Sequence, residues 1–250
     1  MQLNHKLVGA GKPVIVLIHG FLGSASQWDA MVAYLKGNFT ILLVELPGHG
    51  DSPESEKAFS IDSVASAIND IVVQHAILNV HVVGHSMGGY VCAAFAKAYP
   101  LKTKSLVLIN SIAGPDTATR KLLRDRAVAL IDKYQGAYLS MAVSNLFTDE
   151  ERMRYKSSIV TMKERAGRLS IKSIIQSLKA MRSRTGVLNE LKNAAFPITF
   201  ISGSQDAVIS EAHIVGEVAV LAASHVSMTG GHMLLLTHTA QLQEELHFVN

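Results

Sequence analysis

The chain has a single cysteine and no long uncharged apolar run. Cys92 stands alone among 250 residues, so it cannot form an internal disulfide, and a fold held by internal disulfides is excluded. No stretch of about 18 uncharged apolar residues is present, and we therefore expect no membrane insertion. The segment Met1 to Gly11 has one lysine and no apolar stretch of signal-peptide length, which predicts a cytoplasmic location.

Signatures of nucleic-acid and metal binding are also lacking. The formal net charge is only +3, the basic residues are not interleaved with aromatics, and no nucleic-acid motif occurs, so we expect no nucleic-acid partner. No spacing among the 11 histidines resembles a metal site. We accordingly expect neither a metal nor an organic cofactor. The sequence leaves the oligomeric state open.

What the chain does contain is an alternation of short strand-like segments with helical ones. This pattern is typical of one α/β domain whose mostly parallel sheet is covered by helices on both faces. A helix is predicted after Ser60, because this serine stands at an N-cap position before Ile61, Val64 and Ile68 at helical spacing. The predicted strands are 2–8, 14–18, 40–45, 80–83, 105–110, 197–202 and 224–229.

The alternation stops between residues 114 and 190, where the chain becomes helical and rich in Lys, Arg, Met and Ser. We predict a helical cap here, inserted into a core made of residues 1–113 and 191–250. The insert has 15 Lys plus Arg and 8 Asp plus Glu, a net charge of +7. A positive cap attracts anionic substrates, although most of these charges are expected on solvated helix faces. Candidates for facing a pocket are Arg124, Arg126, Arg165, Arg168, Arg182 and Arg184.

Residues 82–89 read Val-Val-Gly-His-Ser-Met-Gly-Gly and place Ser86 in a Gly-x-Ser-x-Gly pentapeptide after an apolar segment. This motif is typical of a nucleophile elbow, a tight turn from strand to helix that exposes the serine hydroxyl. The turn requires that the residues two before and two after the serine have no bulky side chain, and Gly84 and Gly88 meet that requirement. Ser86 is therefore the predicted nucleophile.

Two further residues follow predicted strands in the places that this chemistry needs. A serine hydroxyl needs a base, and His232 in Gly-Gly-His-Met follows the last predicted strand. Asp206, just after strand 197–202, is predicted to orient the imidazole. The chain order Ser, Asp, His differs from the orders of the two common serine protease groups. Asp116 and Glu211 are rival acids that helix capping or solvated faces explain better.

An oxyanion hole is predicted from two main-chain amides. His19-Gly20-Phe21-Leu22 directly follows strand 14–18, so the amide of Phe21 or Leu22 would meet the developing negative charge, and we assign Phe21. Met87 follows the nucleophile and opens a helix, which directs its amide to the same place. Phe21 and Met87 are thus the predicted pair.

At this point the chain resembles the α/β-hydrolase superfamily over its full length. The resemblance implies an eight-stranded, mostly parallel sheet, a helical cap after the sixth strand and hydrolysis through an acyl-enzyme. It is greatest to the capped esterase and carbon–carbon hydrolase branch, although Met233 and Tyr90 stand where specialised carbon–carbon hydrolases and lyases have Trp and Arg. The motifs that carry it are His19-Gly20-Phe21, Leu46-Pro47-Gly48-His49-Gly50-Asp51-Ser52, Gly84-His85-Ser86-Met87-Gly88-Gly89, Asp206 and His232.

These residues predict a serine hydrolase that cleaves a carboxylic ester, with a small-molecule ester or related acyl compound as substrate. Three alternatives use the same machinery: a thioesterase, a carbon–carbon bond hydrolase, and a lyase acting on an anionic substrate. A hypothesis of another class is a non-catalytic ligand receptor that has kept the fold without turnover.

Overall fold

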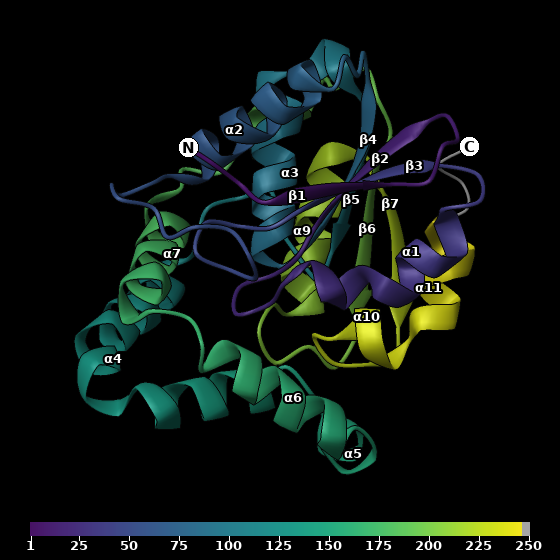
Figure 1. The fold of residues 1–250 in the computed structure, drawn as a ribbon. Coiled ribbons are helices and arrows are strands. Elements are labelled where there is room, and N and C mark those ends of the chain that lie inside the picture. The colour runs from purple at the N-terminus through teal and green to yellow at the C-terminus, as the bar shows by residue number, and fades with distance from the viewer. Residues whose placement is uncertain (247–250) are drawn as a thin grey trace.

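The computed structural model describes residues 1–246, and a seven-stranded sheet forms its centre (Figure 1). The strand order is β1-β3-β2-β4-β5-β6-β7. Only the β1–β3 pair is antiparallel, and the other five pairs are parallel. The strands are β1 (His5–Val8), β2 (Val14–Ile18), β3 (Thr40–Val44), β4 (Val80–His85), β5 (Thr103–Ile109), β6 (Ile198–Gly203) and β7 (Ser224–Met228).

The number of strands corrects one expectation. Each of the seven segments predicted from the apolar pattern forms a strand, but no eighth strand is present within residues 1–246. The resemblance implied eight strands, whereas the sequence offers no further strand-like segment to extend the sheet beyond β1. The helical insert consequently follows the fifth strand of this sheet and not the sixth.

Helices cover both faces of the sheet because its strands are apolar on both sides. Along β2, Ile15 and Leu17 pack into one buried cluster while Val16 and Ile18 pack into another, as the two-residue period of a strand requires. The first cluster is covered by α1 (Asp29–Leu35), α10 (Leu234–Thr237) and α11 (Thr239–Leu246). The second is covered by α2 (Ile61–Gln74), α3 (Met87–Ala98) and α9 (Glu211–Leu221) (Figure 1).

The helices between β5 and β6 extend beyond one end of the sheet (Figure 1). We call this segment, residues 114–190, the cap. Thr148 and Glu151 form a capping box at the start of α5. None of the helices in residues 1–246 is long and apolar enough to cross a membrane. The helices of this segment are α4 (Ala118–Ser144), α5 (Asp149–Arg154), α6 (Lys156–Ala166), α7 (Ile171–Ser183) and α8 (Leu188–Leu191).

Candidate active site

Ser86 lies at the turn between β4 and α3, in a strained backbone conformation. Its φ is 52° and its ψ is −118°, a region that residues with a side chain rarely adopt. Two hydrogen bonds hold the turn. The Ser86 amide donates to the carbonyl of Ile109 at 3.0 Å, and the Ser111 hydroxyl donates to the carbonyl of Ser86 at 2.7 Å. The neighbouring strand β5 thus maintains the strain.

The glycines on either side of Ser86 allow close backbone contacts. A Cβ at Gly84 would lie 2.4 Å from the carbonyl oxygen of Gly88, and a Cβ at Gly88 would lie 2.3 Å from that of Ile18. Both distances are far below van der Waals contact and both involve main-chain atoms. Any larger residue at either position would therefore force the elbow open.

Asp206 and His232 come together although 26 residues separate them. Asp206 Oδ2 lies 2.6 Å from His232 Nδ1, and both side chains are buried. A carboxylate only accepts hydrogen bonds, so Nδ1 carries the hydrogen and Nε2 is left with a lone pair.

The other partners of Asp206 fix its position and its charge. Its carboxylate also accepts from the amides of Val208 and Ile209, at 2.6 and 3.1 Å, and from the side chain of Asn110 at 2.8 Å. Burial alone would raise the pKa of Asp206, but His232 and these donors hold the pKa below its usual value. Asp206 is consequently a fixed anion beside the imidazole. No motif in the sequence indicated the contribution of Asn110.

Ser86 and His232 line the same cavity, which has a volume of about 620 Å³. The cavity lies between the sheet and the cap, and residues of α4 and α7 form much of its wall. Within residues 1–246, no hydrogen bond joins the Ser86 hydroxyl to the His232 ring. Asp206 and His232 are therefore in direct contact, whereas Ser86 and His232 only share a cavity.

The amides of the two predicted oxyanion donors are free, whereas that of Leu22 is engaged. The amide of Leu22 donates to Nε2 of His49 at 3.2 Å, so this amide is already engaged. No partner is present for the amides of Phe21 or Met87 in the part of the chain that the structure describes. Phe21 also lines the cavity. The sequence left Phe21 and Leu22 open as donors, and the hydrogen bond to His49 favours Phe21.

Three buried histidines support the loops around this cavity. Burial lowers the pKa of His19 to about 3, that of His49 to about 4 and that of His85 to about 3. His19 accepts from the Leu46 amide at 3.1 Å. His85 Nε2 lies 2.8 Å from the carbonyl oxygen of His232. All three imidazoles are therefore neutral near pH 7, and they act as hydrogen-bonding supports.

Neither rival acid contacts the His232 ring. Glu211 accepts from the Ser202 hydroxyl at 3.1 Å. Asp116 lies in the loop before α4 and forms ion pairs with Arg124 and Arg184. Burial would raise the pKa of Asp116, but the two guanidinium groups hold this pKa below its usual value.

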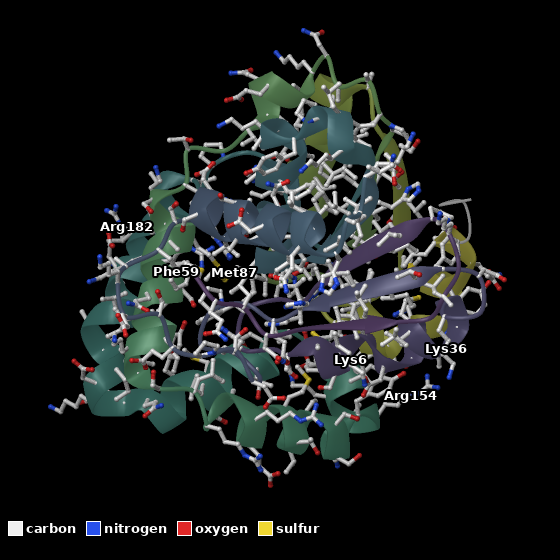
Figure 2. The ribbon with its side chains drawn as sticks, turned by 45° about the horizontal axis from the view of Figure 1, so that its top comes forward. Lys6, Lys36, Phe59, Met87, Arg154 and Arg182 are labelled. Atoms are coloured by element: carbon white, nitrogen blue, oxygen red, sulfur yellow. The ribbon has the colours of Figure 1, made fainter. Side chains whose placement is uncertain are left out.

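The six candidate arginines of the cap occupy four different settings. Arg124 and Arg126 line the cavity that contains Ser86, together with Arg120, which the sequence analysis did not single out. Arg184 is buried and stacks 3.7 Å over the ring of Tyr90. Arg182 pairs with Asp125, and Figure 2 shows Arg182 on the outside of the cap. Arg165 and Arg168 line a separate cavity of about 520 Å³ beside β1 and the loop after β3.

Two further observations concern metal and thiol chemistry. Within residues 1–246, no group of three or more His, Cys, Asp and Glu side chains is arranged to hold a metal ion. Cys92 is buried in α3, and burial raises the pKa of its thiol. Its thiol is therefore protonated and is not a second nucleophile beside Ser86.

The chain is similar to some known proteins over part of its length and to others over most of it. An uncharacterised protein of Mycobacterium tuberculosis is 33% identical over 106 residues, which are 42% of this chain and 31% of that protein. The chain thus spans about a third of the length of this relative. A protein of Escherichia coli named as a carbamate hydrolase, RutD, is 27% identical over 92% of this chain and 84% of its own length.

Structural and family comparisons cover nearly the whole chain. The fold matches that of a thermophilic esterase from Thermogutta terrifontis with a TM-score of 0.90 and 20% identity, over 98% of this chain and 91% of the esterase. The family model described as alpha/beta hydrolase fold matches residues 13–239, which include the elbow, Asp206 and His232. The chain therefore belongs to the alpha/beta hydrolase fold family.

Proposed function

We propose that this protein is a serine hydrolase that cleaves a carboxylic ester through an acyl-enzyme intermediate. The observation that carries the proposal is the hydrogen bond between Asp206 and His232, together with the strained Ser86, which lines the same cavity as His232. Ser86 is the nucleophile, His232 the general base and Asp206 the acid that orients the imidazole.

The mechanism follows from the protonation of the imidazole. With hydrogen on Nδ1, Nε2 of His232 removes the Ser86 proton as Oγ attacks the ester carbonyl. The imidazolium that forms is stabilised by Asp206, and the negative charge on the former carbonyl oxygen is met by the Phe21 and Met87 amides. His232 then protonates the leaving alcohol. Water hydrolyses the acyl-enzyme by the same steps with His232 again as base.

The contact between Ser86 and His232 is expected to form with substrate. Catalytic hydrogen bonds are often long or misaligned without substrate and tighten in the Michaelis complex. The cap forms much of the wall of the 620 Å³ cavity, so its side chains are expected to select the acyl and alcohol groups. In this proposal the substrate is a small molecule, and the reaction uses side chains and water without a resident cofactor.

The similar proteins support a hydrolase, with an ester as the first candidate substrate. The structural neighbour from Thermogutta terrifontis is an esterase, and the Escherichia coli relative is named for the hydrolysis of a carbamate, which is also an acyl compound. A thioesterase, a carbon–carbon bond hydrolase and a lyase remain as alternatives. A receptor without turnover has no need of the Asp206–His232 bond or of free amides at Phe21 and Met87.

Steady-state hydrolysis of p-nitrophenyl esters with acyl chains of two to twelve carbons tests the proposal, with Ser86→Ala as the control. We expect turnover by the wild type that is lost in Ser86→Ala, and stoichiometric labelling of the wild type alone by a fluorophosphonate. Equal turnover or equal labelling of both proteins would show that Ser86 is not the nucleophile. Labelling of the wild type without turnover of any ester would favour one of the other acyl substrates.

A further inference from the structure

The charged side chains that line the active-site cavity are all of one sign. Arg120, Arg124 and Arg126 line it, and no aspartate or glutamate does so within residues 1–246. The surrounding wall is largely apolar. It includes Leu123, Leu130, Met141, Leu178 and Met181. A cavity of this composition suits a substrate with an apolar body and a negatively charged group.

Arg124 is the arginine that is built into the wall. Its side chain is buried, with 9% of the residue exposed. Its Nε and Nη2 both donate to Asp116, which fixes the plane of the guanidinium. Its Nη1 has no hydrogen-bond partner in the described part of the chain. Arg124 lines the cavity that holds Ser86, so this unpaired donor is available to a ligand bound there.

Two tyrosines, Tyr90 and Tyr138, line the same cavity as Arg124. Within residues 1–246 neither hydroxyl has a hydrogen-bond partner. Burial alone would lower the pKa of Arg124, but Tyr90, Asp116 and Tyr138 raise it overall. Burial raises the pKa of Tyr138, so its hydroxyl keeps its proton. The three side chains therefore offer free donors to one ligand.

The local charge balance favours an anion. Asp116 is shared by Arg124 and Arg184, so one carboxylate faces two guanidinium groups. The next buried acid is Glu217, whose oxygens accept from the amides of Ala113 and Gly114. Burial raises the pKa of Glu217. A positive charge that is buried and only partly compensated is costly, and a bound anion offsets that cost.

We propose that Arg124, with the hydroxyls of Tyr90 and Tyr138, binds a carboxylate of the substrate. The substrate class is then an ester that carries a free carboxylate on its acyl or its alcohol portion. Arg124 anchors the carboxylate, the apolar wall covers the intervening methylenes, and the ester carbonyl reaches Ser86 in the same cavity. The ester bond in this inference rests on the proposed function, whereas the carboxylate site rests on the cavity itself.

The first experiment compares a charged ester with its neutral counterpart. The ratio of kcat/KM for ethyl hydrogen adipate to that for diethyl adipate reports how much a free carboxylate on the acyl portion increases kcat/KM. The same ratio for the acetyl ester of 6-hydroxyhexanoate and the acetyl ester of methyl 6-hydroxyhexanoate reports the effect of a free carboxylate on the alcohol portion. We expect the wild type to prefer the charged member of one pair by about tenfold or more, since hydrogen bonds to a charged group contribute this much. Equal kcat/KM within both pairs would overturn the inference.

Variants then assign that preference to Arg124. Arg124→Gln is expected to lower the charged-to-neutral ratio by about 10- to 100-fold. Tyr138→Phe removes one hydroxyl without disturbing the ion pairs and is expected to lower the ratio by a smaller factor. The matched control is Arg182→Gln, which removes an equal charge from the outside of the cap and should leave the ratio unchanged. A ratio that is unchanged in both Arg124→Gln and Tyr138→Phe would refute the assignment.

A binding measurement separates this inference from the proposed function. Calorimetry of monomethyl adipate on Ser86→Ala and on Ser86→Ala with Arg124→Gln does not depend on ester cleavage. Binding that is lost with Arg124 supports the carboxylate site even if no ester is hydrolysed, in which case the proposed function alone fails. Ester cleavage without a charge preference, together with equally weak binding by both proteins, overturns the carboxylate site and leaves the proposed function standing.

Discussion

The core and the cap form the two sides of one cavity with different charged residues. All 11 histidines of the chain lie outside residues 114–190, whereas this segment has 15 of the 23 lysines and arginines. Each side also has one buried aspartate with a lowered pKa. On the core side Asp206 contacts the imidazole of His232, and on the cap side Asp116 contacts the guanidinium groups of Arg124 and Arg184.

The partner of each aspartate determines what the pair can do. Imidazole gains and loses a proton near neutral pH, while guanidinium stays charged. The core pair is therefore suited to move a proton, and the cap pair is suited to hold a fixed charge. Replacing the buried aspartate by asparagine should therefore affect different properties on the two sides.

The largest effect is expected for Asp206→Asn, in activity. Asparagine cannot orient the Nδ1–H tautomer of His232 or stabilise the imidazolium, so kcat should fall by about 10⁴-fold. Steady-state ester hydrolysis measures the change, and circular dichroism confirms that the variant is folded. A fall of less than tenfold in a folded variant would remove Asp206 from the proposed catalytic group.

The second largest effect is a loss in the free energy of unfolding on mild acidification, and it should arise in the core. The folded pKa values of His19, His49 and His85 lie near 3 to 4, below the value of 6.5 for the unfolded chain. Their contribution to stability is therefore fully present above pH 6.5 and is lost as the pH falls toward the folded values. At pH 5.5 each histidine should cost about 1.4 kcal/mol, or about 4 kcal/mol for the three.

Urea unfolding at pH 7.5 and pH 5.5 measures this dependence. His49→Asn should reduce the difference between the free energies of unfolding at the two pH values by about 1.4 kcal/mol, whatever its effect on stability at pH 7.5. The cap contributes no histidine to the effect. Equal free energies of unfolding at the two pH values would mean that these imidazoles are not neutral supports.

Asp116→Asn is expected to affect the cap side through stability. Removing one partner of a buried ion pair leaves uncompensated charge, here on Arg124 and Arg184. We expect a loss of about 3 kcal/mol in the free energy of unfolding, at the lower end of the usual range because asparagine still accepts a hydrogen bond. Urea denaturation at pH 7.5 tests this expectation. A loss below about 1 kcal/mol would show that Asp116 does not compensate these arginines.

The smallest effect is expected for Asp125→Asn, the matched change on the outer surface of the same segment. Asp125 pairs with Arg182, and both side chains are exposed. Water and salt screen such a pair, so the midpoint of thermal unfolding should not change measurably. A change as large as that of Asp116→Asn would mean that burial does not distinguish the two ion pairs.

Much of the core could be predicted from the sequence because its signals are local. Short apolar runs located all seven strands, and Gly84 and Gly88 marked the elbow through their spacing from Ser86. The one error in the sheet, the eighth strand, came from the family resemblance and not from this chain's own pattern. The roles predicted for Ser86, Asp206 and His232 are consistent with the geometry and stay a proposal until activity is measured.

Only the tertiary structure decided which members of each candidate set face the cavity. Whether Phe21 or Leu22 has a free amide depends on His49, which reaches Leu22 across 27 residues. Which cap arginine is buried depends on the packing of α4 and on the position of Asp116. The sequence determines charge, local turns and periodicity because these act between near neighbours. The direction of a long side chain is decided by residues that only the fold brings next to it.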